Sequence, residues 1–246
     1  CGRMTDSKPS KAHHVFPAPE WTSMSSDLAA SLAHEIRNPL LSIKGAAQLL
    51  EQVVDGDDKT LANLIISEAA RIEQLVATLD PLTPNPAQVS AVMNIHEMTE
   101  YVRTAARSFA PDISITTQYD PSLPEVRVVK EAMVQALMNL VKNAVEAVAD
   151  VSAPSITIST RYLLGERMQR TGGKKLPIEL SVTDNGAGVA ADVVGRLFTP
   201  FSSTKENGKG LGLAIVAKIV EEHGGLIAYD APATGGARFS MYLPVA

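Results

Sequence analysis

Apolar residues recur every three or four positions in two stretches near the start of the chain, and this spacing predicts two amphipathic helices. The first stripe covers residues 28–50, after the helix-capping residues 25–27, and the second covers 61–79, after the turn residues 55–58. Pro39 lies inside the first stripe and should kink that helix. Two helices with a short connection form an antiparallel hairpin, and two hairpins in a symmetric dimer would bury both stripes in a four-helix bundle.

Shorter patterns alternate from residue 89 onward. Period-two runs bounded by turn residues indicate strands, and apolar positions at helical spacing indicate helices between them. This order predicts one mixed sheet with helices packed on one face, which is an α+β domain. The expected strands are 89–95, 113–119, 155–162, 178–183, 226–229 and 237–243, and the expected helices are 97–109, 130–148 and 211–223.

Prolines and polar residues divide the chain into parts. Residues 81–88 contain three prolines and should form a stiff linker between a helical hairpin over 25–80 and a second domain over 89–246. Residues 1–24 show no periodicity, so we expect a flexible tail there.

Composition narrows the classes of protein that the chain can belong to. The net charge of −5 argues against general affinity for nucleic acid or anionic membranes. Cys1 is the single cysteine, which excludes an internal disulfide. No apolar run approaches the ~20 residues that cross a bilayer. The first residues also lack the apolar stretch of a secretory signal, so we expect a cytoplasmic protein.

A histidine, a carboxylate and an amide gather on the polar side of the first expected helix. His34 lies two residues from both Leu32 and Ile36, which is about 200° of rotation away from the apolar stripe. Asn38 follows one turn later on the same side, and Glu35 is adjacent. A neutral imidazole is a nucleophile, and a carboxylate can accept the proton of its other nitrogen. The alternative is a solvated polar face on a bundle helix.

Two further motifs suggest a ligand site in the second domain. Asn139 and Asn143 lie one turn apart on an apolar helix, where their carbonyl oxygens could face Mg²⁺ or their amides could cap neighbouring loops. Asp184 follows an expected strand and precedes Gly186 and Gly188. A carboxylate there could accept a hydrogen bond from an exocyclic amine, although this spacing alone indicates only a turn.

A glycine-rich loop leads into the last expected helix. Gly208, Gly210 and Gly212 would leave backbone N–H groups exposed at the helix start, which is a site for anions. The spacing fits neither the Walker nor the Rossmann pattern. Residues 202–208 lack apolar anchors, so we expect a mobile lid there.

The order of these motifs resembles that of the sensor histidine kinases of two-component systems, over about residues 26–244. The stretches 45–50 and 119–124 are similar to the nitrogen-regulation branch of that family. The segments similar to the family's H, N, G1, F and G2 boxes are 33–40, 139–147, 184–188, 198–201 and 208–212.

The resemblance implies a dimerisation and phosphotransfer hairpin followed by a Bergerat-type α/β sandwich that binds ATP. His34 would accept the γ-phosphoryl group, Glu35 would be its base, and Asn38 would orient water for the phosphatase reaction. Asn143, with Asn139 nearby, would hold Mg²⁺. The remaining nucleotide-binding residues would be Asp184 at the adenine amine, Lys205 at the γ-phosphate, and Gly186, Gly188, Phe198, Gly208, Gly210, Leu211 and Gly212 around the pocket and lid.

The implied function is ATP-dependent autophosphorylation on His34 and phosphotransfer to a receiver aspartate of a response regulator, by a homodimer. The usual N-terminal input domain is not recognisable in this chain, so we expect an upstream signalling protein or domain to supply the signal. Two alternatives remain. One is a conformational ATPase of the same ATP-binding family that does not use His34, and the other is a non-catalytic dimeric scaffold that binds nucleotide as a switch.

Overall fold

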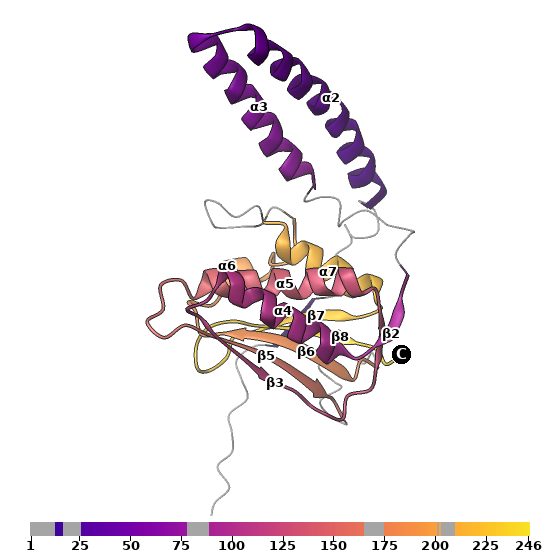
Figure 1. Ribbon diagram of the computed structural model, residues 1–246. Helices are drawn as coiled ribbons and strands as arrows, with labels where there is room; N and C mark the ends of the chain where they lie inside the picture. The colour runs from indigo at the N-terminus through magenta and orange to yellow at the C-terminus, as the bar shows by residue number, and fades with distance from the viewer. Residues whose placement is uncertain (1–12, 17–25, 78–88, 165–174, 201, 203–209) are drawn as a thin grey trace, which may run out of the picture. The chain divides into compact units, whose positions relative to one another are not determined.

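The computed structural model describes residues 13–16, 26–77, 89–164, 175–200, 202 and 210–246 of the chain (Figure 1). The chain separates into two compact units: Glu20–Ala87 forms one, and Cys1–Pro19 together with Gln88–Ala246 forms the other. No helix in these described ranges has the length and hydropathy that a bilayer crossing requires.

The first unit is the expected helical hairpin. Helix α2 (Ser26–Val53) and helix α3 (Gly56–Ala77) pack against each other along their lengths, and α2 continues through Pro39. Gly56 begins α3 with a φ of 64°, a backbone conformation that favours glycine. The buried contacts between the helices include Ala62 and Ala69, which lie seven positions apart on α3 and let the two backbones approach closely.

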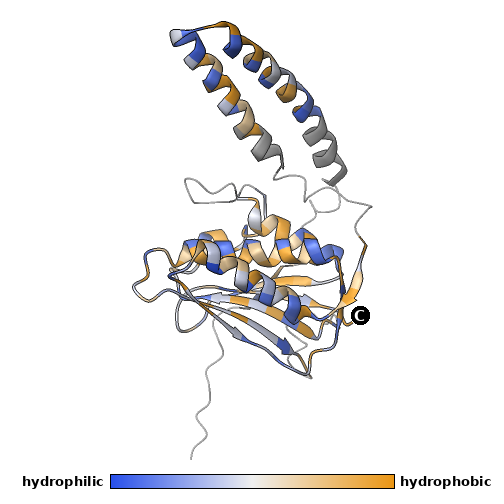
Figure 2. Cartoon of the chain, in the orientation of Figure 1, coloured by the Kyte–Doolittle hydropathy of each residue, from blue (hydrophilic) through white to orange (hydrophobic). Residues whose placement is uncertain are grey.

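Figure 2 shows hydrophobic positions along both helices of the hairpin, and the larger apolar side chains there remain exposed. Leu61 is 58% exposed and Ile43 is 51% exposed, although both belong to the predicted apolar stripes. A single hairpin therefore covers only part of each stripe. The large apolar side chains exposed on α2 and α3 are Ile36, Leu41, Ile43, Leu49, Leu50, Val53, Leu61, Leu64, Ile65 and Ile72.

The second unit is built on a mixed six-stranded sheet in the order β1-β7-β8-β6-β5-β3. Strands β3 and β5 are parallel, and every other neighbouring pair is antiparallel. Helices α4, α5 and α7 cover one face, as the sequence predicted (Figure 1). The bounds are β1 His13–Phe16, β3 Ser114–Gln118, β5 Ser155–Tyr162, β6 Ile178–Asp184, β7 Leu226–Asp230, β8 Arg238–Leu243, α4 Ile95–Phe109, α5 Lys130–Ala147 and α7 Gly212–Glu222.

Three short elements complete the unit. Strands β2 (Ala91–Met93) and β4 (Val126–Val128) pair in a separate antiparallel ribbon, and α6 (Ala191–Val194) follows β6. The sequence analysis expected a strand over 89–95 but did not find β4 or α6, because three or four residues are too few to show a period.

The expectation of a flexible tail over residues 1–24 is wrong for β1. His13–Phe16 pair with β7 at the end of the sheet. An edge strand presents a row of unpaired N–H and C=O groups, and a passing segment can satisfy them without a strong sequence signal of its own. Four residues beside prolines gave no such signal.

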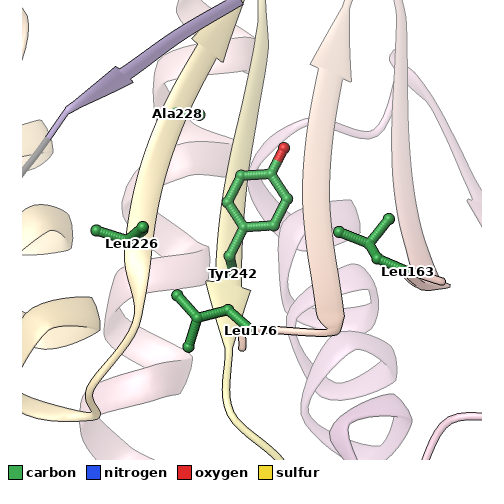
Figure 3. Packing of buried hydrophobic residues seen from close by; sticks show 5 residues of the cluster. All are labelled: Leu163, Leu176, Leu226, Ala228 and Tyr242. Atoms are coloured by element: carbon green, nitrogen blue, oxygen red, sulfur yellow. The ribbon is translucent and has the colours of Figure 1, made fainter. Parts of the chain in front are cut away.

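Both faces of the central strands are buried. The paired residues Ile158, Val182 and Phe239 lie on the face under the helices. On the opposite face an apolar cluster of Leu163, Leu176, Leu226, Ala228 and Tyr242 is packed together (Figure 3).

The polar residues of this opposite face pair with one another. Arg238 donates to Glu179 at 2.8 Å, and Ser240 donates to the same carboxylate oxygen at 3.1 Å. Glu179 is 1% exposed, so this polar side chain of strand β6 is buried rather than solvated.

A half-buried histidine joins the start of α4 to the sheet. Asn94 caps α4 by accepting from the backbone of His96, and the His96 ring stacks on Tyr119 with 4.6 Å between ring centroids. Its Nε2 lies 2.9 Å from the Thr160 hydroxyl. Burial lowers the pKa of His96 below its ordinary value of 6.5, and the carboxylate of Asp120 opposes that shift.

This lowered pKa predicts a pH dependence of stability. The folded state favours neutral His96, so the stabilisation is complete above the ordinary pKa and is lost as pH falls through the lower folded pKa. We expect the urea midpoint of wild type to exceed that of His96→Gln at pH 8, and the difference to shrink by pH 5. A difference that stays constant over this range would show that His96 does not titrate as stated.

Candidate nucleotide site and phosphoacceptor helix

The two asparagines of α5 lie against the first residue of α7. Asn139 Nδ2 donates to the Gly212 carbonyl at 3.4 Å. A Cβ atom placed on Gly212 would lie 3.8 Å from Asn143 Oδ1. The fold thus brings together two motifs that are about 70 residues apart in sequence. Asn139 makes the backbone contact that the capping alternative expects, while the Asn143 amide borders the start of α7.

The N-terminal end of α7 has the form of an anion site. Gly210 has a φ of 64°, and the buried Leu211 anchors the turn that follows it. Among the residues that the structure describes, no side chain caps the helix, and its first turn carries no acidic residue. The first N–H groups of a helix have no partner within the helix, and they lie at the positive end of its dipole. This end can therefore bind a phosphate through its backbone.

Asp184 is held at the end of β6 by three backbone hydrogen bonds. Its Oδ1 accepts from the N–H groups of Gly186 at 2.9 Å and Ala237 at 3.2 Å. Its own N–H donates to the Ala237 carbonyl at 2.9 Å. The residue is 5% exposed. These contacts fix the carboxylate as a directed hydrogen-bond acceptor.

Glycines let the surrounding backbone reach Asp184. A Cβ on Gly186 would lie 2.3 Å from the Ala147 carbonyl oxygen at the end of α5, so no side chain fits there. A Cβ on Gly236 would lie 1.9 Å from the Asp184 carbonyl oxygen. Gly188 has a φ of 75°, with Gly236 close by. Gly236 was not predicted as part of this site, although the doublet that it forms with Gly235 between two expected strands was an available signal.

Tyr229 is a second residue of this region that sequence reasoning missed. It lies in β7 and is 3% exposed. Burial raises the pKa of its hydroxyl, a backbone hydrogen bond from Val189 opposes the shift, and the carboxylates of Asp184 and Asp230 raise it further. The phenol therefore stays protonated beside Asp184. Nothing in the local sequence separates this tyrosine from a core residue.

Phe198 is buried where the chain runs from α6 toward α7. It is 2% exposed, and its ring makes edge contacts with Phe16 at 4.7 Å and Phe239 at 6.3 Å between centroids. Ser202 Oγ donates to the Thr199 carbonyl at 2.6 Å just beyond it. The predicted lid residues Lys205 and Gly208 lie outside the described residues.

The segment around His34 lies on α2. His34 belongs to this helix by its backbone, and its side chain lies outside the described part of the structure. Glu35 and Asn38 are exposed, and Leu40 in the next positions is buried against α3. Ser42 Oγ donates to the Asn38 carbonyl at 3.3 Å. This segment thus combines the exposed Glu35 and Asn38 with the buried Leu40, whereas Ile36 of the predicted apolar stripe is 39% exposed.

Family models match both units. Residues 128–246 match the histidine kinase-, DNA gyrase B- and HSP90-like ATPase family, and residues 24–82 match the His kinase A (phospho-acceptor) domain.

Relatives extend across both units. The chain is 48% identical over 207 residues to the sensory histidine kinase/phosphatase NtrB of Rhizobium leguminosarum bv. phaseoli, with 82% of this chain and 54% of that protein covered. It is 44% identical to NtrB of Rhizobium meliloti with the same coverage. This chain therefore spans about half the length of these relatives.

A solved structure has the same arrangement of elements. Full-length ShkA in complex with AMPPNP aligns with a TM-score of 0.61 at 25% identity, covering 90% of this chain and 47% of that chain. Its likeness covers the helical hairpin as well as the sheet, because neither unit alone makes up 90% of this chain. The chain therefore belongs to the sensor histidine kinases of two-component systems, and within them it is of the NtrB type.

Proposed function

We propose that this chain is a kinase core that transfers the γ-phosphoryl group of ATP to His34 and then to an aspartate of a response-regulator receiver domain. The observation that carries the proposal is the meeting of the asparagines of α5 with the glycine-initiated start of α7. An anion-binding helix start beside amide oxygens is suited to a phosphate chain and its counter-ion. The phospho-acceptor match on the hairpin favours this function over the conformational ATPase and the scaffold.

The nucleotide would be held at its two ends by different groups. The N–H groups at the start of α7 would bind phosphate oxygens, and Asp184 would accept a hydrogen bond from the adenine amine. The fixed orientation of the Asp184 carboxylate supports this role, because both its N–H donors are backbone groups that cannot rotate away. The absence of a side chain at Gly186 keeps the turn close to α5.

The described side chains alone do not supply enough ligands for a divalent cation, so phosphate oxygens of the nucleotide would supply the others. Within the described residues no three His, Cys, Asp or Glu side chains gather as a metal site of protein ligands would require. Asn143 offers an amide oxygen beside the proposed phosphate site, and Mg²⁺ accepts such an oxygen together with phosphate oxygens and water. When bound, Mg²⁺ would neutralise charge on the phosphates.

The phosphoryl group would be accepted on α2. A ring nitrogen of His34 forms a bond to the γ-phosphorus while the bond from that phosphorus to the bridging oxygen breaks, and ADP leaves. Glu35 takes the proton from the other ring nitrogen, and its exposed position one residue away supports this role. In the second transfer the phosphorus–nitrogen bond breaks as an aspartate oxygen of the regulator bonds to phosphorus.

Hydrolysis of the regulator's phosphoryl group is the second proposed activity. The relatives' printed name, kinase/phosphatase, supports two activities for this chain. Asn38 is exposed on α2 one turn after His34, where its amide can orient an attacking water. We assign the input for these activities to a signalling protein or domain outside the chain.

A second copy of the chain would cover the exposed stripe of the hairpin. On α2, Leu40 and Ala47 are buried against α3, while Ile43 and Leu50 lie on the same stripe and remain half exposed. The phospho-acceptor family supports a homodimer, in which these side chains would form the centre of a four-helix bundle.

The phosphoacceptor is tested by substitution. With labelled ATP, wild type should acquire an acid-labile label, and His34→Gln should acquire none because amide nitrogen is not a nucleophile. Nucleotide binding by His34→Gln, measured by calorimetry, should equal that of wild type. Label that persists in His34→Gln would refute the assignment.

The role of Asn38 predicts a separation of the two activities. Asn38→Ala should lower the regulator phosphatase rate by about 10²-fold, because an unpositioned water loses the correct geometry, while autophosphorylation continues. Asn63→Ala is the matched control, since Asn63 is an equally exposed amide on α3. Equal phosphatase rates for Asn38→Ala and wild type would contradict the role.

The dimer predicts a position-specific effect of charge. Ile43→Asp should convert the dimer to monomer, because it removes burial worth about 1.5–3 kcal/mol per side chain and places a carboxylate in an apolar interface. Leu49→Asp is the control: Leu49 is 68% exposed and lies on the side of α2 opposite the stripe. Sedimentation velocity distinguishes the species, and a dimeric Ile43→Asp protein would exclude this interface.

A further inference from the structure

Strand β1 attaches the chain that precedes the phosphoacceptor helix to the nucleotide-binding unit. His13–Phe16 pair antiparallel with β7 in a continuous register, from His13 opposite Asp230 to Phe16 opposite Ile227. Without β1, strand β7 would be the edge of this sheet. Strand addition of this kind satisfies backbone groups along an edge, and the alternating side chains provide specificity.

The two faces of β1 make different contacts. Val15 packs against the cluster of Leu226, Ala228 and Tyr242 on the face away from the helices; the cluster itself is drawn in Figure 3. Phe16 points to the other face, where its ring meets Phe198 edge-on at 4.7 Å. Both side chains are half-buried, whereas that of the preceding residue, His14, is exposed, and its ring centroid lies 6.3 Å from that of Phe16. Side-chain contacts as well as backbone pairing thus hold the strand on β7.

Phe198 links this strand to the nucleotide site. It is almost fully buried between Phe16 and Phe239, and the chain that follows it leads to Gly210 and the start of α7. Loss of the Phe16 ring would uncover one side of Phe198. An aromatic pair of this geometry contributes about 0.5–1.5 kcal/mol beyond its buried area.

Strand β1 precedes α2, the helix that carries His34, and only a short connection separates them. Only residues 17–25 separate Phe16 from the first residue of α2, and a fully extended stretch of that length spans about 30 Å. His34 lies eight residues further, about 12 Å along the helix. A change that reaches α2 from upstream must therefore pass through the segment that is paired with β7.

We propose that residues 13–16 form a releasable clip, which pairs with the β7 edge and supports nucleotide binding by packing Phe16 on Phe198. When the clip is released, the unit binds ATP more weakly. Because binding and pairing are linked, nucleotide also strengthens the clip. The inference rests on the proposed function only in taking ATP as the ligand of this unit.

The test uses the full chain with three substitutions. Phe16→Ala removes the ring that covers Phe198, and Val15→Asp places a carboxylate against the apolar cluster. His14→Ala is the matched control, because it changes an exposed side chain of the same strand. Binding of AMPPNP with Mg²⁺ is measured by calorimetry, and protection of residues 226–230 is measured by amide hydrogen exchange.

We expect Phe16→Ala to weaken AMPPNP binding by about 2- to 10-fold, and His14→Ala to leave it unchanged. Amides of β7 should exchange faster in Val15→Asp, and saturating AMPPNP should slow their exchange in wild type. If Phe16→Ala binds AMPPNP as tightly as wild type, the link through Phe198 is refuted. If AMPPNP does not change exchange in β7, the coupling is refuted.

Failure of this inference differs from failure of the proposed function. Both measurements are made on nucleotide binding and backbone exchange, so they do not depend on His34. If wild type binds AMPPNP but acquires no label on His34, the kinase assignment is refuted. The clip is then still tested by AMPPNP binding and by amide exchange in β7. Phe16→Ala remains decisive if Val15→Asp fails to fold, because the Phe16 ring lies outside the apolar cluster.

Discussion

The close approach of three backbone segments at Asp184 is the constraint on which the nucleotide unit depends. The carboxylate is fixed by N–H groups from its own turn and from the turn between β7 and β8. Those turns reach it only because Gly186 and Gly236 have no side chain to collide with the end of α5 or with Asp184 itself. A methyl group at Gly236 would displace β8 from β6, and it would also displace the Ala237 N–H group that donates to Asp184. A substitution there would therefore change both the sheet and the position of the Asp184 carboxylate.

Periodicity was sufficient to predict most of the architecture. Strand β5 is found at the predicted residues 155–162, and helices α4, α5 and α7 differ from their predicted ranges by one or two residues. These elements are long enough for several repeats of their period, and glycines mark the end of α7. For the site, motif order indicated that Asn139, Asp184 and Gly212 act together, and the hydrogen bond from Asn139 to Gly212 joins two of these motifs.

Features determined by distant neighbours were not predictable. Strand β1 has four residues, and its pairing depends on the open edge of β7, which lies over 200 residues later in the chain. The alternation in β6 indicated which residues share a face, but a polar residue such as Glu179 usually marks a solvated face. Arg238 and Ser240 on β8 supply its partners, and their pairing with β6 is a property of the sheet rather than of either strand.

Small residues have different structural roles in the two units. In the hairpin, Ala62 and Ala69 allow α2 and α3 to pack closely, while the larger apolar side chains remain exposed. In the nucleotide unit, glycines give ligand-binding backbone its position. Under the proposed function, His34 lies in one unit and the nucleotide-binding groups lie in the other, so phosphoryl transfer would require both units. Because the units are joined through residues 17–25 and 78–90, a contact such as that of Phe16 with Phe198 acts where one of these connections meets the nucleotide unit. Control of the reaction can therefore be exerted through the connections, without any change to the groups that carry it out.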